Sequence, residues 1–360
     1  MSKKILSQKF KQSLIQQKLS NLVSNSKQKV HLKGALGSSL TFSVFTVFKS
    51  SNRPFLLIFN TKEEAAYYLN DFEMLLDEKQ VLFYPGSYRR PYHVEETDNA
   101  NVLLRAEVLN RINSQKKPAV IVTYPEALFE KVVSRTQLEK SIFKVSVGET
   151  LNLEFLNEVL FEYHFSRVDF VTEPGEFSVR GGIVDVFSFS HDEPYRIEFF
   201  GDEVESIRTF NIESQLSTNT IKKIQILPNI EHKLLNETRQ SFFEYISPDT
   251  LIFVKSITNL LEATEKLQEK AREAYDALTS GINYSNPVDL FCTSANFKSQ
   301  LLNFSIVEFG MNAILATDVS QKVEFQVGPQ PSFNKQFNLL IEELNSKHDL
   351  GYHNFICCSS

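Results

Sequence analysis

Three short apolar runs, each next to a helix-like stretch, constrain the fold of this chain most strongly. The runs are PFLLIFN (54–60), QVLFYPG (80–86) and PAVIVTYPEAL (118–128). Continuous apolar runs of this length are typical of strands covered on both faces. The first helix should begin at Thr61, which can form a capping box with Glu64. The second should begin at Asp98 or Asn99, and a turn is expected at Pro125. This alternation predicts a parallel sheet with helices on its faces.

The middle of the chain has a different pattern. One helix is predicted over 151–164, and residues 167–210 alternate strands with turn signals, which is typical of an antiparallel α+β module. After residue 228 the strand and helix alternation returns. A strand is predicted over 249–254, a long helix over 257–278, and a final strand over 354–360. A chain that stops in such a strand is expected to be a piece of a longer protein. The pattern alone permits three successive domains or one α/β domain split by an inserted module.

Composition limits the partners and the compartment. The 360 residues carry a formal net charge of −6, which disfavours strong unaided binding to a nucleic-acid backbone. The only three cysteines, Cys292, Cys357 and Cys358, follow no zinc spacing and favour a reducing cytoplasm. The helical N-terminal stretch lacks the apolar core of a signal peptide, and no run is long enough to span a membrane. We therefore expect a cytoplasmic protein without membrane contact.

The stretch GALGSSLT (34–41) resembles a phosphate-binding loop in which the lysine is missing. In the pattern G-x-x-x-x-G-K-[ST], backbone N–H groups surround the phosphates and the lysine reaches the β- and γ-phosphates. When Gly34 and Thr41 are aligned with this pattern, Ser39 takes the second glycine position and Leu40 takes the lysine position, while Gly37 lies between them. The stretch is either a degenerate nucleotide site or an ordinary turn before a helix. Because Leu40 cannot neutralise phosphate charge, we predict no ATP hydrolysis by this chain.

Side-chain alternation in the middle module places two arginines and a phenylalanine on one face. In PYRIEFFG, Tyr195, Ile197 and Phe199 form the apolar set, so the other face receives Arg196, Glu198 and Phe200. In GEFSVRG, Phe177 and Val179 face the core, whereas Ser178 and Arg180 point outward. Arginine and aromatic residues are enriched at binding hot spots. The arginines could instead pair with neighbouring acids on a solvated face.

Other candidate sites are weaker. YPGSYRRPYH (84–93) could stack on single-stranded nucleic acid, although a surface loop explains it equally well. The seven histidines are scattered without metal-ligand spacing, and no nucleophile motif is found. We therefore predict no catalytic residue and no metal site.

A long motif run in the middle module resembles the bacterial transcription-repair coupling factor family. The run is GEFSVRGGIVDVF followed by PYRIEFFGDEVESIR, and GALGSSL and GPQPSFNKQFNLLIEEL also resemble that family. UvrB, an excinuclease subunit, has a shorter version of the same run. The resemblance covers about residues 28–360 and implies one degenerate RecA-like α/β domain formed by two outer segments, with the α+β module inserted between them.

The resemblance also implies a division of the chain. The expected parts are an N-terminal helical extension (1–27), the first part of the RecA-like domain (28–143), the inserted UvrA-binding module (144–228), the second part of the RecA-like domain (229–348) and the start of a linker or further domain (349–360).

For function, the resemblance implies an adaptor that recruits UvrA to lesions where RNA polymerase has stalled. The family's recognition residues, two arginines and a phenylalanine, correspond here to Arg180, Arg196 and Phe200. The resemblance places the ATP- and Mg²⁺-dependent motor and the contacts to polymerase and DNA in segments outside this chain, and it implies a C-terminal end that masks the UvrA face. No cofactor is therefore expected here. The alternative is a UvrB-type, helicase-like ATPase that binds damaged DNA directly.

Overall fold

The computed structural model divides the chain into two compact units, Met1–Phe325 and Gln326–Ser360. It describes residues 2–24, 27–76, 80–87, 99–113, 117–228, 239–278, 285–316, 318–328 and 331–354. The described part of the second unit contains one helix, α13 (Phe337–Asp349). The final strand expected over 354–360 falls almost entirely outside the described residues, as does most of the 84–93 stretch.

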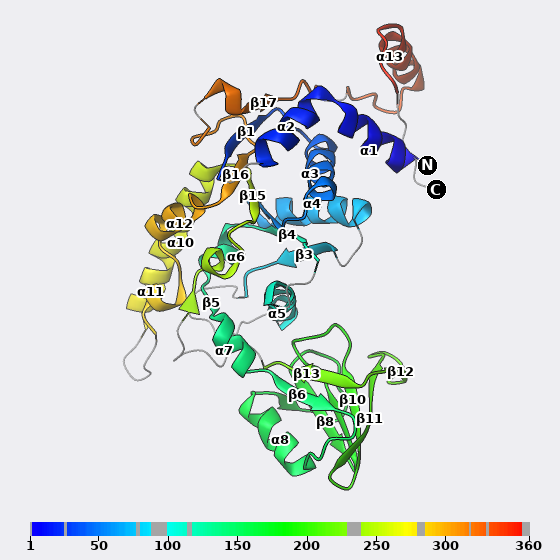
Figure 1. The fold of residues 1–360 in the computed structure, drawn as a ribbon, viewed down its shortest axis with the longest axis vertical. Helices are drawn as coiled ribbons and strands as arrows, with labels where there is room; N and C mark the ends of the chain where they lie inside the picture. Colours follow the sequence, from blue (N-terminus) through cyan, green and yellow to red (C-terminus); the bar gives the residue numbers. More distant parts are fainter. Residues whose placement is uncertain are drawn as a thin grey trace. The chain divides into compact units, whose positions relative to one another are not determined.

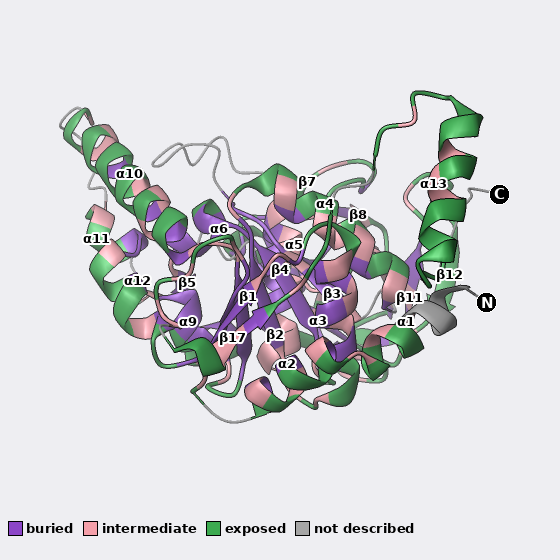
Figure 2. Cartoon of the chain, turned by 90° about the horizontal axis from the view of Figure 1, so that it is seen from above, coloured by how far each residue is buried: buried purple, intermediate pink, exposed green. Residues whose placement is uncertain are grey.

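A seven-stranded, fully parallel sheet forms the centre of the first unit (Figure 1). Its strands, in spatial order, are β17 (Lys322–Glu324), β1 (Lys29–Lys33), β16 (Ser305–Glu308), β15 (Leu251–Val254), β2 (Phe55–Ile58), β4 (Val120–Thr123) and β3 (Val81–Tyr84). Every residue of the four strands from β16 to β4 is buried, as expected for a sheet covered on both faces (Figure 2). The apolar runs at 54–60 and 118–128 thus became central strands, whereas the run at 80–86 became β3 at the edge of the sheet.

The order of the strands shows that the outer segments form a single α/β domain. Strand β15 pairs with β2, and β16 pairs with β1, so segments on either side of the middle module build one sheet. The predicted fold class, an α/β RecA-like domain formed by two outer segments with an inserted antiparallel module, is confirmed. The exact domain boundaries stay predictions.

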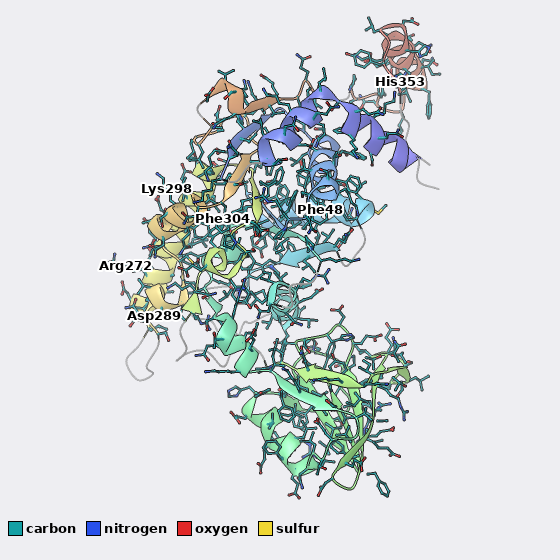
Figure 3. The ribbon with its side chains drawn as sticks, viewed as in Figure 1. Phe48, Arg272, Asp289, Lys298, Phe304 and His353 are labelled. Atoms are coloured by element: carbon teal, nitrogen blue, oxygen red, sulfur yellow. The ribbon has the colours of Figure 1, made fainter. Side chains whose placement is uncertain are left out.

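Helices surround this sheet and contact one another through apolar side chains. They are α1 (Ser2–Gln12), α2 (Leu14–Ser24), α3 (Ser38–Ser50), α4 (Lys62–Leu75), α5 (Asn99–Asn113), α6 (Pro125–Phe129), α7 (Arg135–Lys140), α9 (Phe242–Tyr245), α10 (Ile257–Asp276), α11 (Pro287–Leu290) and α12 (Ser294–Leu301). At the end of α3, Phe48 packs edge-to-face on Phe55 of β2, with ring centroids 5.2 Å apart (Figure 3). Phe304, which precedes β16, packs near Phe243 of α9.

Local details differ from the sequence predictions in two places. Thr61 caps α4 by accepting a hydrogen bond from the Glu64 N–H at 3.2 Å, but the Glu64 carboxylate accepts from the Asn60 N–H and also pairs with Lys255. Only one of the two capping-box hydrogen bonds is therefore formed, because the Glu64 carboxylate bonds instead to the Asn60 N–H and to Lys255, the residue after β15. Pro125 does not make a turn but begins helix α6. Proline is favourable there because an N–H at the first helical position has no acceptor within the helix, so its absence costs no hydrogen bond.

The inserted module contains a six-stranded sheet, one helix and a two-stranded ribbon. The sheet runs β12 (Ser217–Thr220), β11 (Glu203–Phe210), β10 (Tyr195–Phe200), β9 (Ile183–Val186), β8 (Glu176–Arg180) and β7 (Ser166–Arg167). The ribbon pairs β6 (Phe143–Ser146) with β13 (Lys223–Ile226). Outside the module, a second short ribbon pairs β5 (Val132–Val133) with β14 (Arg239–Gln240). Helix α8 (Leu153–Glu162) packs on one face of the sheet, where Phe161 meets Phe177 of β8 edge to face.

Candidate functional site

The loop between β1 and α3 is held by contacts within the protein. Gly34 has a φ of 74°, and a Cβ atom there would overlap the backbone carbonyl oxygen of Phe325. The Phe325 N–H donates to the carbonyl oxygen of Lys33 at 2.8 Å, which brings the end of β17 against the loop. The glycine at position 34 is therefore required by a neighbouring strand, and no ligand is needed to explain it.

Three of the groups that a phosphate-binding loop would present have partners inside the protein. The N–H groups of Ser39 and Leu40 donate to the carbonyl oxygens of Leu36 and Gly37 at 3.2 and 3.1 Å. The Leu40 side chain is 1 % exposed and belongs to the main apolar core. The buried Thr41 hydroxyl donates to the Asp71 carboxylate of α4 at 3.1 Å. Leu40 and Thr41, which stand where the pattern has a lysine and a magnesium-binding hydroxyl, thus pack α3 against the rest of the protein.

Replacing Gly34 by Ala is expected to destabilise the first unit by about 1–3 kcal/mol, because the substitution combines a strained positive φ with a backbone overlap. Gly148→Ala is the matched control, since Gly148 has a φ of 82° but a Cβ added there would have no atom within 4 Å. Urea denaturation followed by circular dichroism compares the two variants. Equal losses of stability in both would show that the contact with Phe325 contributes nothing.

The face of the module sheet opposite α8, here called the outer face, carries the predicted recognition residues. Along β10, Tyr195, Ile197 and Phe199 are buried, Arg196 is half-buried, and Phe200 is 79 % exposed, which confirms the predicted alternation. Phe200 is thus a large apolar side chain that the strand leaves in solvent beside charged groups.

Ser178 departs from the expectation that the polar residues of β8 would be solvated. It lies on the outer face but is only 2 % exposed, and its hydroxyl donates to the carbonyl oxygen of Asp169 at 3.0 Å. The segment after β7 therefore crosses this part of the sheet. Strand alternation alone cannot reveal such a covering segment, because it describes only the strand itself.

Asp185 forms the centre of the outer face. It lies on β9 directly opposite Arg196 of β10 and Ser178 of β8, and it is 1 % exposed. Arg196 donates to both carboxylate oxygens of Asp185, from Nε at 2.7 Å and from Nη2 at 2.9 Å. Arg180 pairs with the same carboxylate from the other side. One buried carboxylate thus holds two guanidinium groups, so the local pairing of the arginines that the sequence left open is present.

The two arginines nevertheless differ in exposure. The Arg196 side chain is 15 % exposed, donates a further hydrogen bond to the carbonyl oxygen of Gln215 at 3.1 Å, and stacks on the buried Phe210 ring. The hydrogen bonds to Asp185 raise the pKa of Arg196. The Arg180 side chain is 41 % exposed. Arg180 can therefore contact a partner while bound to Asp185, whereas most of the Arg196 guanidinium is engaged within the module.

Two glycine-containing hairpins bring Arg180 and Phe200 to the same end of the sheet. The turn after β8 contains Gly181, with a φ of 60°, and the turn after β10 contains Gly201, with a φ of 63°. Between them, the Phe199 N–H donates to the Gly182 carbonyl oxygen at 2.8 Å. The structure thus brings the predicted residues together on one surface. Beside them, Arg208 and Glu198 form a second ion pair at 2.6 Å.

Other site types find no support among the described residues. No group of three metal-ligating side chains occurs within them, and none of their helices is both long and apolar enough to cross a bilayer. A cavity of about 390 Å³ lies beside the amino ends of β2 and β4, lined by residues that include Pro54, Ala119 and Thr250. Burial raises the pKa of the Cys292 thiol to about 12, so this cysteine stays protonated at neutral pH.

Comparison with known proteins finds a family that the inserted module resembles. Residues 143–232 match the UvrB interaction domain, a range that contains the whole outer face. The transcription-repair-coupling factor of Bacillus subtilis is 30 % identical over 227 residues, covering 63 % of this chain and 19 % of that protein. The corresponding factor of Rickettsia bellii is 29 % identical over 260 residues, covering 69 % of this chain and 23 % of that protein.

A second kind of relative matches as well. UvrABC system protein B of Thermotoga neapolitana is 26 % identical over 231 residues, covering 61 % of this chain and 34 % of that protein. The chain spans about a fifth of the length of the coupling factors it matches. Residues 143–232 therefore match the UvrB interaction domain, in a chain that is similar to part of the transcription-repair-coupling factors and of UvrABC system protein B.

Proposed function

We propose that this chain recruits UvrA to DNA repair through the outer face of the inserted module. The observation that carries the proposal is the exposed pair Arg180 and Phe200, which lies on one surface of a module that matches the UvrB interaction domain. Exposed arginine and aromatic side chains at a rigid sheet end have the composition of a protein-binding hot spot. Arg196 contributes by holding Asp185, and thereby Arg180, in place.

In this proposal the chain is the UvrA-binding region of a transcription-repair coupling factor. The similarity to coupling factors over about two thirds of the chain supports this role in nucleotide excision repair. Contacts to stalled RNA polymerase and to DNA, and the ATP-dependent motor, would belong to further segments of a longer protein. We propose that the chain itself binds no nucleotide, because Leu40 replaces the lysine of the loop and is buried.

Binding between the purified chain and UvrA tests the proposal. Arg180→Ala and Phe200→Ala should each weaken binding by about thirtyfold, which is the effect of a residue worth about 2 kcal/mol. The control is Phe155→Ala, because Phe155 is also half-exposed and in the same module but lies on α8. Circular dichroism establishes that each variant is folded. Folded Arg180 and Phe200 variants that bind UvrA as the wild type does would refute the proposal.

The rival function, a UvrB-type ATPase that binds damaged DNA directly, makes a different prediction. Such a protein would bind ATP and would bind DNA with a steep dependence on salt. The internal partners of Ser39, Leu40 and Thr41 disfavour the first property, and the net charge of −6 disfavours the second.

A further inference from the structure

A second exposed aromatic residue lies next to Arg180, at a position that neither the strand pattern nor the family resemblance singled out. Phe170 is 61 % exposed, and the Arg180 guanidinium lies 5.5 Å from the centre of its ring. This distance is within the range of a cation–π contact. Phe170 and Phe200 are the most exposed phenylalanines among the described residues of the module.

The backbone holds Phe170 in this exposed position. The Val168 N–H donates to the carbonyl oxygen of Phe177 at 2.9 Å, and the Asp169 carbonyl oxygen accepts from Ser178. The Thr172 N–H donates to the Glu176 carboxylate at 2.8 Å. Hydrogen bonds on both sides of Phe170 therefore fix its segment to β8, so little conformational entropy remains to be lost on binding.

The side chain after Phe170 points the opposite way. Val171 is fully buried in a small cluster with Phe187 and Phe210, and the Phe210 ring is the one on which Arg196 stacks. Exposure of Phe170 is thus a consequence of burying Val171, and it is coupled to the same framework that holds the arginines. A phenylalanine that its own backbone segment keeps exposed to solvent is suited to a contact with another protein.

We propose that Phe170 is a third contact residue for UvrA, next to Arg180 on the outer face that also carries Phe200. The inference rests on the proposed function. Arg180, Asp185 and Arg196 together carry one net positive charge, since one carboxylate is shared by two guanidinium groups. The outer face therefore presents a cationic centre together with two exposed aromatic side chains, and it fits a partner surface that carries an acidic group and apolar recesses.

The test compares UvrA binding by Phe170→Ala, Phe170→Tyr, Phe200→Ala and Phe155→Ala variants of the chain. Phe170→Ala should weaken binding about tenfold without changing the urea midpoint, because the side chain is mostly exposed. Phe170→Tyr should bind as the wild type does, since it keeps the ring beside Arg180. Phe155→Ala, which removes an exposed phenylalanine of α8, should have no effect on binding.

Each outcome distinguishes the role of Phe170 from the proposed function. If Phe170→Ala binds as the wild type does while Phe200→Ala binds weakly, Phe170 makes no contact and the proposed function stands. If Phe170→Ala and Phe155→Ala weaken binding equally, the effect is not specific to the outer face and the inference is wrong. If neither Phe200→Ala nor Phe170→Ala changes binding, the proposed function itself is wrong.

Discussion

Asp185→Asn is expected to lower the free energy of unfolding by about 3–5 kcal/mol, the usual cost of removing one partner from a buried ion pair. The substitution keeps the shape of the side chain but removes the charge that holds Arg180 and Arg196. Arg196 cannot easily turn toward water, because it lies between Asp185, the Gln215 carbonyl oxygen and the Phe210 ring. Its charge would stay mostly buried beside a neutral amide.

Urea denaturation followed by circular dichroism, with hydrogen exchange of the β9 and β10 amides, measures this effect and locates it in the module. Glu205→Gln is the control, because Glu205 is an exposed acid on the neighbouring strand β11 and its loss should change stability by less than about 0.5 kcal/mol. We also expect weaker UvrA binding by Asp185→Asn, since Arg180 loses its anchor. A loss of stability no larger than that of Glu205→Gln would show that the carboxylate does not hold the two arginines.

Leu40→Lys, which restores the lysine of the phosphate-loop pattern, is expected to destabilise the first unit and not to create an ATP site. The Leu40 side chain lies in the apolar core, so a lysine there would be desolvated. Burial that lowers the lysine pKa by about 3 costs about 4 kcal/mol of stability at neutral pH. The loop amides that would bind phosphate stay bonded to Leu36 and Gly37.

The stability deficit of Leu40→Lys should also depend on pH. A buried lysine with a lowered pKa binds fewer protons in the folded state than in the unfolded state, so stability rises with pH up to the unfolded pKa of about 10.4. The deficit should therefore shrink between about pH 7 and pH 10. Leu36→Lys is the matched control, because Leu36 is exposed in the same loop. Stabilisation of Leu40→Lys by millimolar ATP would contradict the expectation and indicate a repairable nucleotide site.

Several features of the protein could be predicted from short windows of sequence. The runs at 54–60 and 118–128 form the central strands β2 and β4, because a fully buried strand must be apolar at almost every position. The two-residue period of PYRIEFFG placed Arg196 and Phe200 on the outer face without a structure. Alignment of GALGSSLT with the phosphate-loop pattern placed Leu40 at the lysine position.

Other features depended on contacts between distant residues. The role of Gly34 comes from Phe325, which follows a strand near the opposite end of the first unit's sequence. Phe170 could not be predicted because its exposure results from the burial of Val171 and from the path of the segment across β8, neither of which has a periodic signal.

The sequence by itself determined the strands β2, β3, β4 and β15, the helices α4, α5 and α10, and which face of β10 is polar. It also placed Leu40 at the lysine position of the phosphate-loop pattern. Only the tertiary structure decided the order of the strands in the parallel sheet, that Asp185 binds both arginines, and that Phe170 lies beside Arg180. The physical reason is the separation along the sequence of the residues that set each feature. Local periodicity is set by the burial of neighbouring residues along one element, whereas strand order and side-chain partners are set by packing that brings distant segments together.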